Sequence, residues 1–337
     1  MQKITLLLFF LLCFACQQIG DVDSQAEGTL NDTTSSKENQ YENPDLEKGE
    51  GRSDTLTPPI ETGDYDPKQI FVRRGELPDL MQPGSRIMPL ISAHRGGRDI
   101  AGYPENSLEV FQYVTDRIPA MLECDVNISS DGVLHLMHDN SLDRTTTGTG
   151  SVQNTTWEKM KNLNLVDDFG QQTAFKIPQL EEVLQWAKGK ALLSLDVKRN
   201  IPFKNVVDMV EEFGMEDYVV IITYNVNDAL TVHRFNPRLM ISVSIRNEEE
   251  WQRMRTSGLP IDRMVAFTGT RLAPVSLWKT LQAEQIPVIL GTLGNLDKQA
   301  AAQGDEKTYG GFLDRGADIL ATDRPLEARQ VIDVWKD

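Results

Sequence analysis

The sequence predicts an α/β fold, a TIM (β/α)8 barrel with a small insertion after the second strand. From about residue 86 onward, short apolar or β-branched runs alternate with longer segments of helical periodicity, which is typical of β-α repeats and a parallel sheet. Eight such runs over roughly 250 residues suit this barrel. A stretch rich in Thr, Gly and Asn before Ile177 is too long for a simple loop, so we place the insertion at about residues 128–176.

The eight predicted strands follow one another with helical patterns between them. They are Met88–Ala93, Met121–Asn127, Ala191–Val197, Tyr218–Thr223, Leu239–Ile245, Met264–Phe267, Val288–Leu290 and Ile319–Ala321. Catalytic groups collect at the carboxyl ends of the strands in such a barrel, so a site is expected there.

Three of the intervening helices carry signals at their starts. Asn106 stands three residues before Glu109, so we interpret Asn106 as an N-cap followed by an acidic residue, as in a capping box. The helical patterns at 179–186 and 326–335 begin beside prolines. Asp323 precedes the last of these patterns and is interpreted as a cap rather than a catalytic residue.

Residues 1–16 predict an export signal of the lipoprotein type. An apolar run follows the basic start and ends at Cys16, and this run is too short to cross a membrane. Ala15 before the cysteine resembles a bacterial lipobox, in which the cysteine becomes the lipidated first residue, although Cys13 stands where leucine is usual. We expect lipidation at Cys16, and cleavage without lipidation is the alternative.

Residues 17–60 predict an acidic flexible linker that leads to a folded part at 61–337. The linker carries ten acidic and three basic side chains and almost no periodic apolar positions, so it cannot bury enough surface to fold alone. The formal net charge of −16 disfavours nucleic acid as a partner. After export and lipidation only Cys124 would remain free, so no intramolecular disulfide is expected. These features predict an exported lipoprotein of the bacterial cell envelope, periplasmic or attached to the outer membrane, which meets the membrane through its anchor alone.

Two alternating carboxylates and a downstream histidine form the most informative motif of the chain. Side chains two residues apart on a strand point the same way, so Glu123 and Asp125 share one face and their apolar neighbours occupy the other. His138 follows after a short connection. A solvated edge strand shows the same alternation, so the pair becomes informative only together with its neighbours.

Polar residues at two other predicted strand ends complete the pattern. The first strand runs into His94 and Arg95, and the third carries Asp196 and Lys198 on a shared face. Such repetition at corresponding positions is hard to attribute to chance. We therefore interpret these ends as one site.

The residue types match the needs of phosphodiester cleavage. Three carboxylates, from Glu123, Asp125 and Asp196, are the oxygen ligands that a hard divalent cation such as Ca²⁺ or Mg²⁺ prefers. Zinc is disfavoured because carboxylates dominate the set. Arg95 and Lys198 are expected to bind the phosphate oxygens of a small-molecule substrate and to offset their charge.

Two of the four histidines are predicted to act in proton transfer. An imidazole titrates near neutral pH, so one of His94 and His138 would accept a proton from the nucleophile and the other would donate one to the leaving oxygen. Asp139 either orients His138 or stabilises its turn. His135 lies an odd number of residues from His138 and is interpreted as structural, and His233 as a surface residue on a helix.

A series of motifs runs in order through most of residues 88–337. They are His94-Arg95-Gly96, Pro104-Glu105-Asn106-Ser107, Glu123-Cys124-Asp125-Val126, Asp131-Gly132, His138-Asp139, Leu142-Asp143-Arg144-Thr145-Thr146, Ile177-Pro178, Asp196-Val197-Lys198 and the segment 316–325. In this order they resemble the glycerophosphodiester phosphodiesterase family. The resemblance implies a TIM barrel with a small insertion and metal-dependent hydrolysis of a glycerophosphodiester to glycerol phosphate and an alcohol. It makes His94 and His138 the acid–base pair and Glu123 and Asp125 metal ligands.

The chain departs from the family pattern in two places. Asp196 stands where a glutamate is usual, and its shorter side chain puts the affinity for the metal and the choice of metal in question. Residues 289–295 replace a segment that contains tryptophan in relatives and would help to shape the pocket for the alcohol or glycerol. The substrate is therefore less determined than the reaction type.

Two other functions remain open at this point. One is a phospholipase of the sphingomyelinase D or phosphoinositide type, which uses the same barrel on intact lipid. The other is a lipoprotein that binds a headgroup without catalysis. Within the leading hypothesis, the resemblance leaves open whether water or a neighbouring glycerol hydroxyl attacks the phosphorus. Glu105 is left out of the site because the residue before a cap is often structural.

Overall fold

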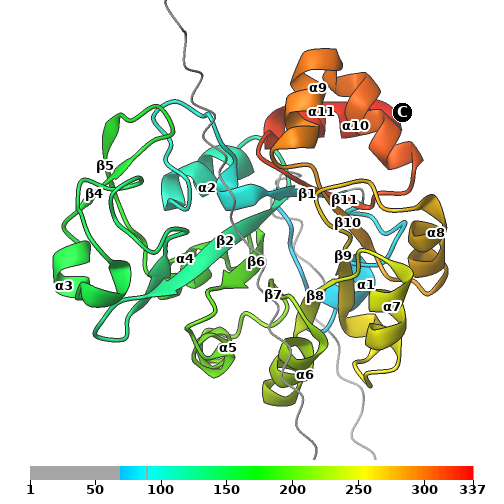
Figure 1. The fold of residues 1–337 in the computed structure, drawn as a ribbon, viewed down its shortest axis with the longest axis horizontal. Coiled ribbons are helices and arrows are strands. Elements are labelled where there is room, and N and C mark those ends of the chain that lie inside the picture. The colour runs from blue at the N-terminus through cyan, green and yellow to red at the C-terminus, as the bar shows by residue number, and fades with distance from the viewer. Residues whose placement is uncertain (1–68, 89, 337) are drawn as a thin grey trace, which may run out of the picture. The chain divides into compact units, whose positions relative to one another are not determined.

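Eight parallel strands close into a barrel in the computed structural model, which describes residues 69–88 and 90–336 (Figure 1). The strands are β1 (Leu90–Ala93), β2 (Ala120–Ile128), β6 (Leu192–Val197), β7 (Val219–Thr223), β8 (Met240–Ser244), β9 (Met264–Phe267), β10 (Val288–Gly291) and β11 (Ile319–Thr322). Each pairs in parallel with the next, and β1 pairs with both β2 and β11, which closes the sheet. The predicted TIM barrel is confirmed, and each strand differs from its predicted bounds by at most two residues.

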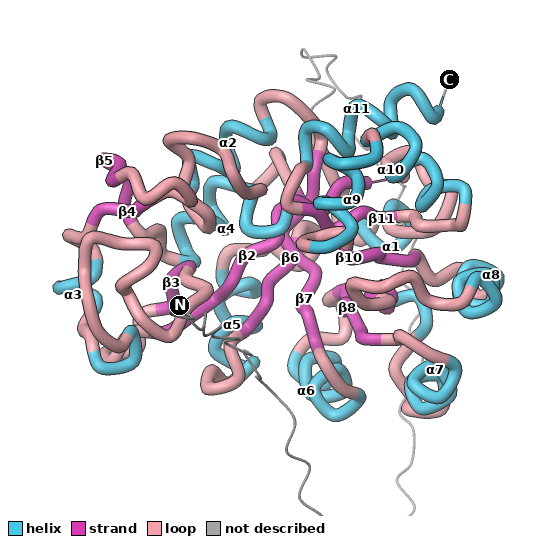
Figure 2. The backbone as a smooth tube through the Cα atoms, turned by 45° about the horizontal axis from the view of Figure 1, so that its top comes forward, coloured by secondary structure: helices cyan, strands magenta, loops and turns pink. Residues whose placement is uncertain are grey.

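Helices lie around the outside of the strands (Figure 2). In chain order they are α1 (Leu77–Leu80), α2 (Leu108–Thr115), α4 (Leu180–Ala187), α5 (Phe203–Glu212), α6 (Val226–Phe235), α7 (Glu248–Arg255), α8 (Val275–Ala283), α9 (Asn295–Gln303), α10 (Asp305–Asp314) and α11 (Pro325–Lys336). Helix α5 illustrates the pattern, because Val206, Val207 and Val210 are buried while Lys204 and Asp208 pair in solvent. The core thus fills the layer between strands and helices.

The start of α2 corrects one prediction. Ser107, not Asn106, is the N-cap, because its hydroxyl accepts the amide hydrogen of Val110. Asn106 lies just outside the helix with a φ of 57°. Its side-chain amide donates to Oδ2 of Asp125 at 2.8 Å, and its Oδ1 accepts the amide hydrogen of Asp125 at 3.0 Å. Asn106 therefore holds a residue of β2 rather than a helix end.

The insertion is a small layer with its own core between β2 and α4, as the sequence predicted. It comprises β3 (Leu134–Leu136), the 3₁₀ turn η2 (Val152–Asn154), α3 (Trp157–Met160) and a hairpin of β4 (Asn164–Val166) and β5 (Gln172–Lys176). Strand β3 pairs antiparallel with the end of β2. The apolar side chains of this second core are Met137, Leu142, Val152, Met160, Leu165 and Ile177. The insertion therefore extends from β2 and packs on itself.

The predicted export signal and linker, residues 1–60, lie outside the described residues. The described residues belong to one unit, Ile60–Asp337. Among them, no helix has both the length and the apolar character that crossing a bilayer requires.

Candidate active site

A cavity of about 250 Å³ opens at the carboxyl ends of the barrel strands. Six of the seven predicted site residues line it, namely His94, Arg95, Glu123, Asp125, His138 and Asp196. Its remaining walls come from Ser92 of β1, Ser194 of β6, and strands β7 to β11 with the segments that follow them. Pairing of β1 with β2 and of β2 with β6 and β3 brings these residues together, although they lie up to about a hundred positions apart in the chain.

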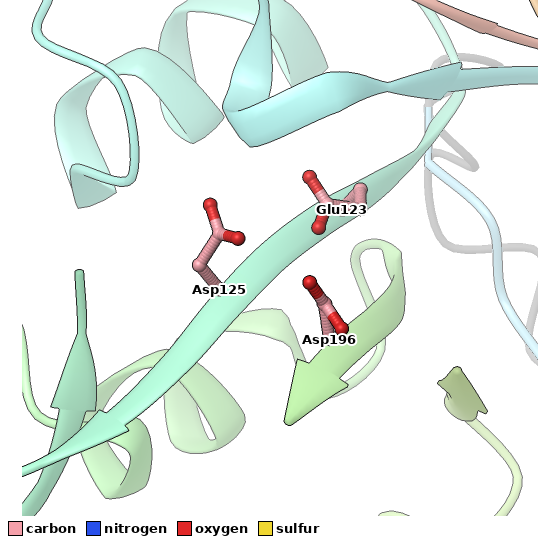
Figure 3. Close-up of side chains that lie close together, drawn as sticks. All are labelled: Glu123, Asp125 and Asp196. Carbon is pink, nitrogen blue, oxygen red and sulfur yellow. The ribbon is translucent and has the colours of Figure 1, made fainter. Parts of the chain in front are cut away.

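The three carboxylates meet because of the register between β2 and β6. Asp125 pairs directly with Asp196 across the two strands, and Glu123 lies one pleat earlier on the same face. Figure 3 shows Glu123 and Asp125 on one strand, with Asp196 rising from its neighbour toward Glu123. One oxygen from each residue lies within 4.8 Å of the others. Oxygen-only donors at this spacing fit a hard divalent cation.

Burial and mutual repulsion act on this cluster. Burial, together with the nearby charge of Asp125, raises the pKa of Glu123 to about 8. Burial also opposes ionisation of Asp125, but Lys198 and Arg95 outweigh it and lower the pKa of that carboxyl. Burial and repulsion thus favour a neutral Glu123 near pH 7, while Lys198 and Arg95 keep Asp125 ionised.

Arg95 contacts two acidic residues at the cavity wall. Its backbone N–H donates to Oε2 of Glu123 at 2.9 Å. Its Nε lies 3.1 Å from Oδ2 of Asp125, an ion pair without the alignment of a hydrogen bond. A φ of 56° at Arg95 and the absence of a side chain at Gly96 allow this arrangement, since a Cβ at Gly96 would collide with Val110 of α2. The His-Arg-Gly motif thus allows close packing of the turn after β1 against α2.

Lys198 lies behind the carboxylates and does not line the cavity. Its Nζ donates to Oδ1 of Asp125 at 2.8 Å and lies 3.6 Å from Oδ2 of Asp196. Its contacts in this structure are therefore with two candidate metal ligands.

Each cavity histidine is bonded through Nδ1 to a carboxylate. Nδ1 of His94 lies 2.7 Å from Oδ1 of Asp323, and Nδ1 of His138 lies 2.7 Å from Oδ1 of Asp139. Such a pair favours the proton on Nδ1 and leaves Nε2 for the cavity. Asp139 thus contacts the ring, one of the two roles predicted for it. Burial opposes protonation of His94, but Asp323 and Glu123 outweigh it and raise its pKa.

Two residues at this site escaped the sequence analysis. The interpretation of Asp323 as a helix cap was wrong, because its carboxylate binds His94 and accepts the amide hydrogen of Gly294, not one of α11. The hydroxyl of Tyr224 donates to Oδ1 of Asp196 at 2.8 Å. Both residues directly follow a barrel strand, and that position alone was a usable signal.

The other two histidines lie away from the cavity. His135 is fully buried in β3 beside Trp157, and its Nδ1 lies 3.1 Å from the carbonyl of Val133. Burial lowers the pKa of His135 to about 4, so it is neutral at pH 7. His233 lies on α6, on the outside of the barrel, and is half-buried.

Other parts of the cavity wall carry hydroxyl and apolar side chains. The hydroxyls come from Thr223, Ser242, Ser244 and Thr270, and the apolar groups include Ile222, Phe267, Ile289 and Leu293. The last two belong to the segment 289–295, where the chain departs from the expected tryptophan-containing pattern. That segment therefore shapes the cavity with aliphatic side chains.

Comparisons with known proteins agree with this geometry. The family model described as "Glycerophosphoryl diester phosphodiesterase family" matches residues 94–299. A glycerophosphodiester phosphodiesterase of Bacillus altitudinis is 30% identical over 164 residues, which cover 46% of this chain and 66% of the relative. A glycerophosphodiester phosphodiesterase from Caldanaerobacter subterraneus is 31% identical over 161 residues, which cover 46% of this chain and 65% of that relative. The chain thus spans just under two thirds of these relatives.

Solved structures extend the likeness over the barrel. A glycerophosphoryl diester phosphodiesterase from Parabacteroides distasonis has 32% identity and a TM-score of 0.75, covering 79% of this chain and 94% of that one. An Oleispira antarctica phosphodiesterase was solved with the product sn-glycerol-3-phosphate. It has 19% identity and a TM-score of 0.58, and the match covers 73% of this chain and 98% of that one. At this identity the likeness shows the fold alone. With a barrel, a cavity and a family match that covers more than half of its length, this chain belongs to the glycerophosphoryl diester phosphodiesterase family.

Proposed function

We propose that the protein hydrolyses glycerophosphodiesters to glycerol phosphate and an alcohol. The observation that carries the proposal is the pair of imidazoles, each held through Nδ1 by a carboxylate, on one cavity with three clustered carboxylates. The family and the activity in the names of its relatives support it. The Oleispira relative was solved with sn-glycerol-3-phosphate, the product expected here.

The two imidazoles divide the proton transfers of the reaction. One accepts the proton of the attacking oxygen through Nε2, a new P–O bond forms, and the other donates a proton to the alcohol oxygen as its P–O bond breaks. The nucleophile is water, or it is the glycerol hydroxyl beside the phosphate, followed by hydrolysis of the cyclic ester. Either route consumes one water molecule.

Glu123, Asp125 and Asp196 would hold a divalent cation, Ca²⁺ or Mg²⁺. Oxygen donors within 4.8 Å of one another support this assignment. When bound, the cation supplies positive charge to the phosphate oxygens. Arg95 lines the cavity and adds charge beside the same carboxylates, whereas Lys198 keeps Asp125 ionised from behind.

A substrate panel tests the function. The purified full chain is expected to release glycerol phosphate from glycerophosphocholine or glycerophosphoethanolamine when Ca²⁺ or Mg²⁺ is present. Addition of a chelator should stop this release. Cleavage of intact sphingomyelin or phosphoinositide alone would replace this function by a phospholipase activity. If the protein bound headgroups but turned over none of the substrates, the proposal that it is an enzyme would be contradicted.

We also propose that the protein is an exported lipoprotein of a bacterial envelope, anchored through Cys16. The support is the sequence of residues 1–60, which lies outside the described residues. In a bacterial host, the wild-type chain should partition with membranes and yield an acylated N-terminal peptide by mass spectrometry. Cys16→Ser should abolish acylation, and a wild-type chain without acylation would contradict the anchor.

A further inference from the structure

Arg144 comes from the insertion but reaches two carboxylates at the active site. It belongs to the segment Leu142–Thr146, which the family resemblance included without a role for the arginine. The side chain is 42% exposed, so burial of apolar surface does not explain its position. It is not among the residues that line the cavity.

The guanidinium makes four hydrogen bonds to two acidic residues. Nε and Nη2 donate to the two oxygens of Asp139 at 2.7 and 3.0 Å. Nη1 and Nη2 donate to the two oxygens of Glu105 at 2.9 and 2.8 Å. Two bidentate contacts fix the plane of the guanidinium and the orientation of both carboxylates.

Each of these carboxylates also accepts a hydrogen bond from a cavity residue. Oδ1 of Asp139 accepts from Nδ1 of His138 at 2.7 Å. Oε1 of Glu105 accepts from Nη1 of Arg95 at 3.0 Å. Arg144 therefore stands at the centre of a chain of contacts that runs from His138 to Arg95.

The charge of Arg144 keeps both carboxylates ionised. Its hydrogen bonds are the main reason that the pKa of Asp139 lies far below its usual range. Burial opposes ionisation of Glu105, which is 3% exposed, but Arg144 and Arg95 outweigh it and lower its pKa. An ionised Asp139 accepts a hydrogen bond from His138 and cannot donate one.

The core of the insertion fixes the backbone on both sides of Arg144. Leu142 is buried in that core, and its carbonyl accepts from the hydroxyl of Thr146 at 2.6 Å. The hydroxyl of Thr145 contacts Sδ of Met137 at 3.2 Å. The guanidinium therefore projects from a rigid segment, as positioning of a catalytic group requires.

We propose that Arg144 is a positioning residue, which locks Asp139 and thereby the tautomer and orientation of the His138 ring, and which couples that ring to Arg95 through Glu105. This inference rests on the proposed function, because it gives the insertion a part in the same reaction. In this proposal the insertion helps to position a catalytic group.

Kinetics of four variants test the coupling. Arg144→Gln and Asp139→Asn are each expected to lower kcat about 10- to 100-fold, the usual effect of a misplaced catalytic group. The double variant should fall within about threefold of Asp139→Asn alone, because both changes break one chain of contacts. Arg144→Lys keeps the charge but not the two bidentate contacts, so it should recover only part of the rate.

Asp168→Ala is the matched control. Asp168, also in the insertion, pairs with Arg98 at 3.0 Å and accepts the amide hydrogen of Asp99. Its loss weakens docking of the insertion without touching His138, so kcat should stay within about threefold of wild type. Equal losses for Asp168→Ala and Arg144→Gln would overturn the proposal, and so would full additivity of Arg144→Gln with Asp139→Asn.

Nuclear magnetic resonance of the imidazole nitrogens separates this inference from the proposed function. The chain has four histidines, so the His138 ring is assignable by comparison with His138→Gln. The wild-type ring should hold its proton on Nδ1 at a pH where it is neutral, and Arg144→Gln should show both tautomers in exchange. An unchanged tautomer would overturn the positioning role. This result needs no turnover, so a wild-type protein inactive on every substrate would refute the function and leave the positioning test intact.

Discussion

At the scale of single residues, the partner behind each histidine separates catalytic from structural candidates. His138 has a carboxylate at Nδ1 and the cavity in front of it, whereas His135 has a backbone carbonyl and the insertion core around it. Only the first arrangement leaves an imidazole nitrogen for substrate.

Alanine variants of these two histidines should therefore differ in kind. His138→Ala is expected to lower kcat about 10²- to 10⁴-fold with unchanged stability, because it removes a proton-transfer group at the cavity. His135→Ala should keep turnover but lower the free energy of unfolding by about 2 kcal/mol, since it empties a buried position. Steady-state kinetics and urea unfolding measure the two effects. Similar losses of turnover from both variants would contradict the site assignment.

Tyr224 supports a candidate metal ligand from its exposed side. Tyr224→Phe removes the hydroxyl that donates to Asp196, so the affinity for Ca²⁺ or Mg²⁺ should fall about tenfold, as for other outer partners of ligands. Calorimetric titration of each metal measures this change. Tyr113→Phe, on α2 beside Tyr103, is the matched control and should bind each metal with the affinity of the wild type. Equal affinities for Tyr224→Phe and wild type would contradict the role.

Asp318 makes stability depend on pH at a position remote from the cavity. Burial raises its pKa to about 6, above the value near 3.8 of a free aspartate, so ionisation destabilises the folded state as pH rises through this range. Asp318→Asn cannot ionise and keeps an oxygen for the amide of Val288. It should be more stable than wild type by up to about 3 kcal/mol at pH 8, with the gap closing toward pH 4. Urea unfolding between about pH 4 and pH 8 measures the difference in free energy of unfolding between the two proteins. A difference independent of pH would contradict the role of Asp318.

At the scale of elements, the register of β2 against β6 and the start of α2 place the carboxylates. The pairing of Asp125 with Asp196 makes the cluster, because a shift of one residue would turn one of the two to the helix-facing side. Asn106 then holds both the backbone and the side chain of Asp125 from the loop before α2.

The neighbours Ser107 and Asn106 should therefore give opposite phenotypes. Ser107→Ala removes the cap of α2 and is expected to cost about 1 kcal/mol of stability with little effect on kcat. Asn106→Ala releases Asp125 and should weaken metal binding and turnover about tenfold or more. Thermal unfolding and metal titration of both variants compare them. If Asn106→Ala left the affinity for the metal unchanged, the conclusion that Asn106 holds Asp125 in place would be contradicted.

The insertion is the element whose contribution the sequence pattern described least. Its length and its Thr- and Gly-rich composition predicted that it exists. Yet Asp139 joins His138 to Arg144 within it, and Arg144 binds Glu105 of the segment before α2. Such contacts leave no periodicity in the chain, so composition alone could not reveal them.

At the scale of the whole molecule, the site is contained in one unit. The residues that line the cavity run from Ser92 to Ala321, inside the unit Ile60–Asp337. A chain that begins at Ile60 is therefore expected to fold and to keep kcat/KM on soluble glycerophosphodiesters within about twofold of the full chain. Circular dichroism and steady-state kinetics of both chains test this. A truncated chain that folds but turns over more than tenfold more slowly would contradict it.

Periodicity and local motifs in the chain were enough to predict the strands, the insertion and six of the residues that line the cavity. Strand periodicity and local motifs are properties of neighbouring residues, so the order of residues along the chain is enough to place Glu123, Asp125 and His94 at strand ends. The groups behind these residues became known only from the three-dimensional arrangement. Asp323 reaches His94 across 229 positions, Lys198 turns to Asp125 rather than into the cavity, and Arg144 joins two carboxylates of different segments. These contacts depend on closure of the barrel and on side-chain directions after packing, and no local pattern in the chain encodes either.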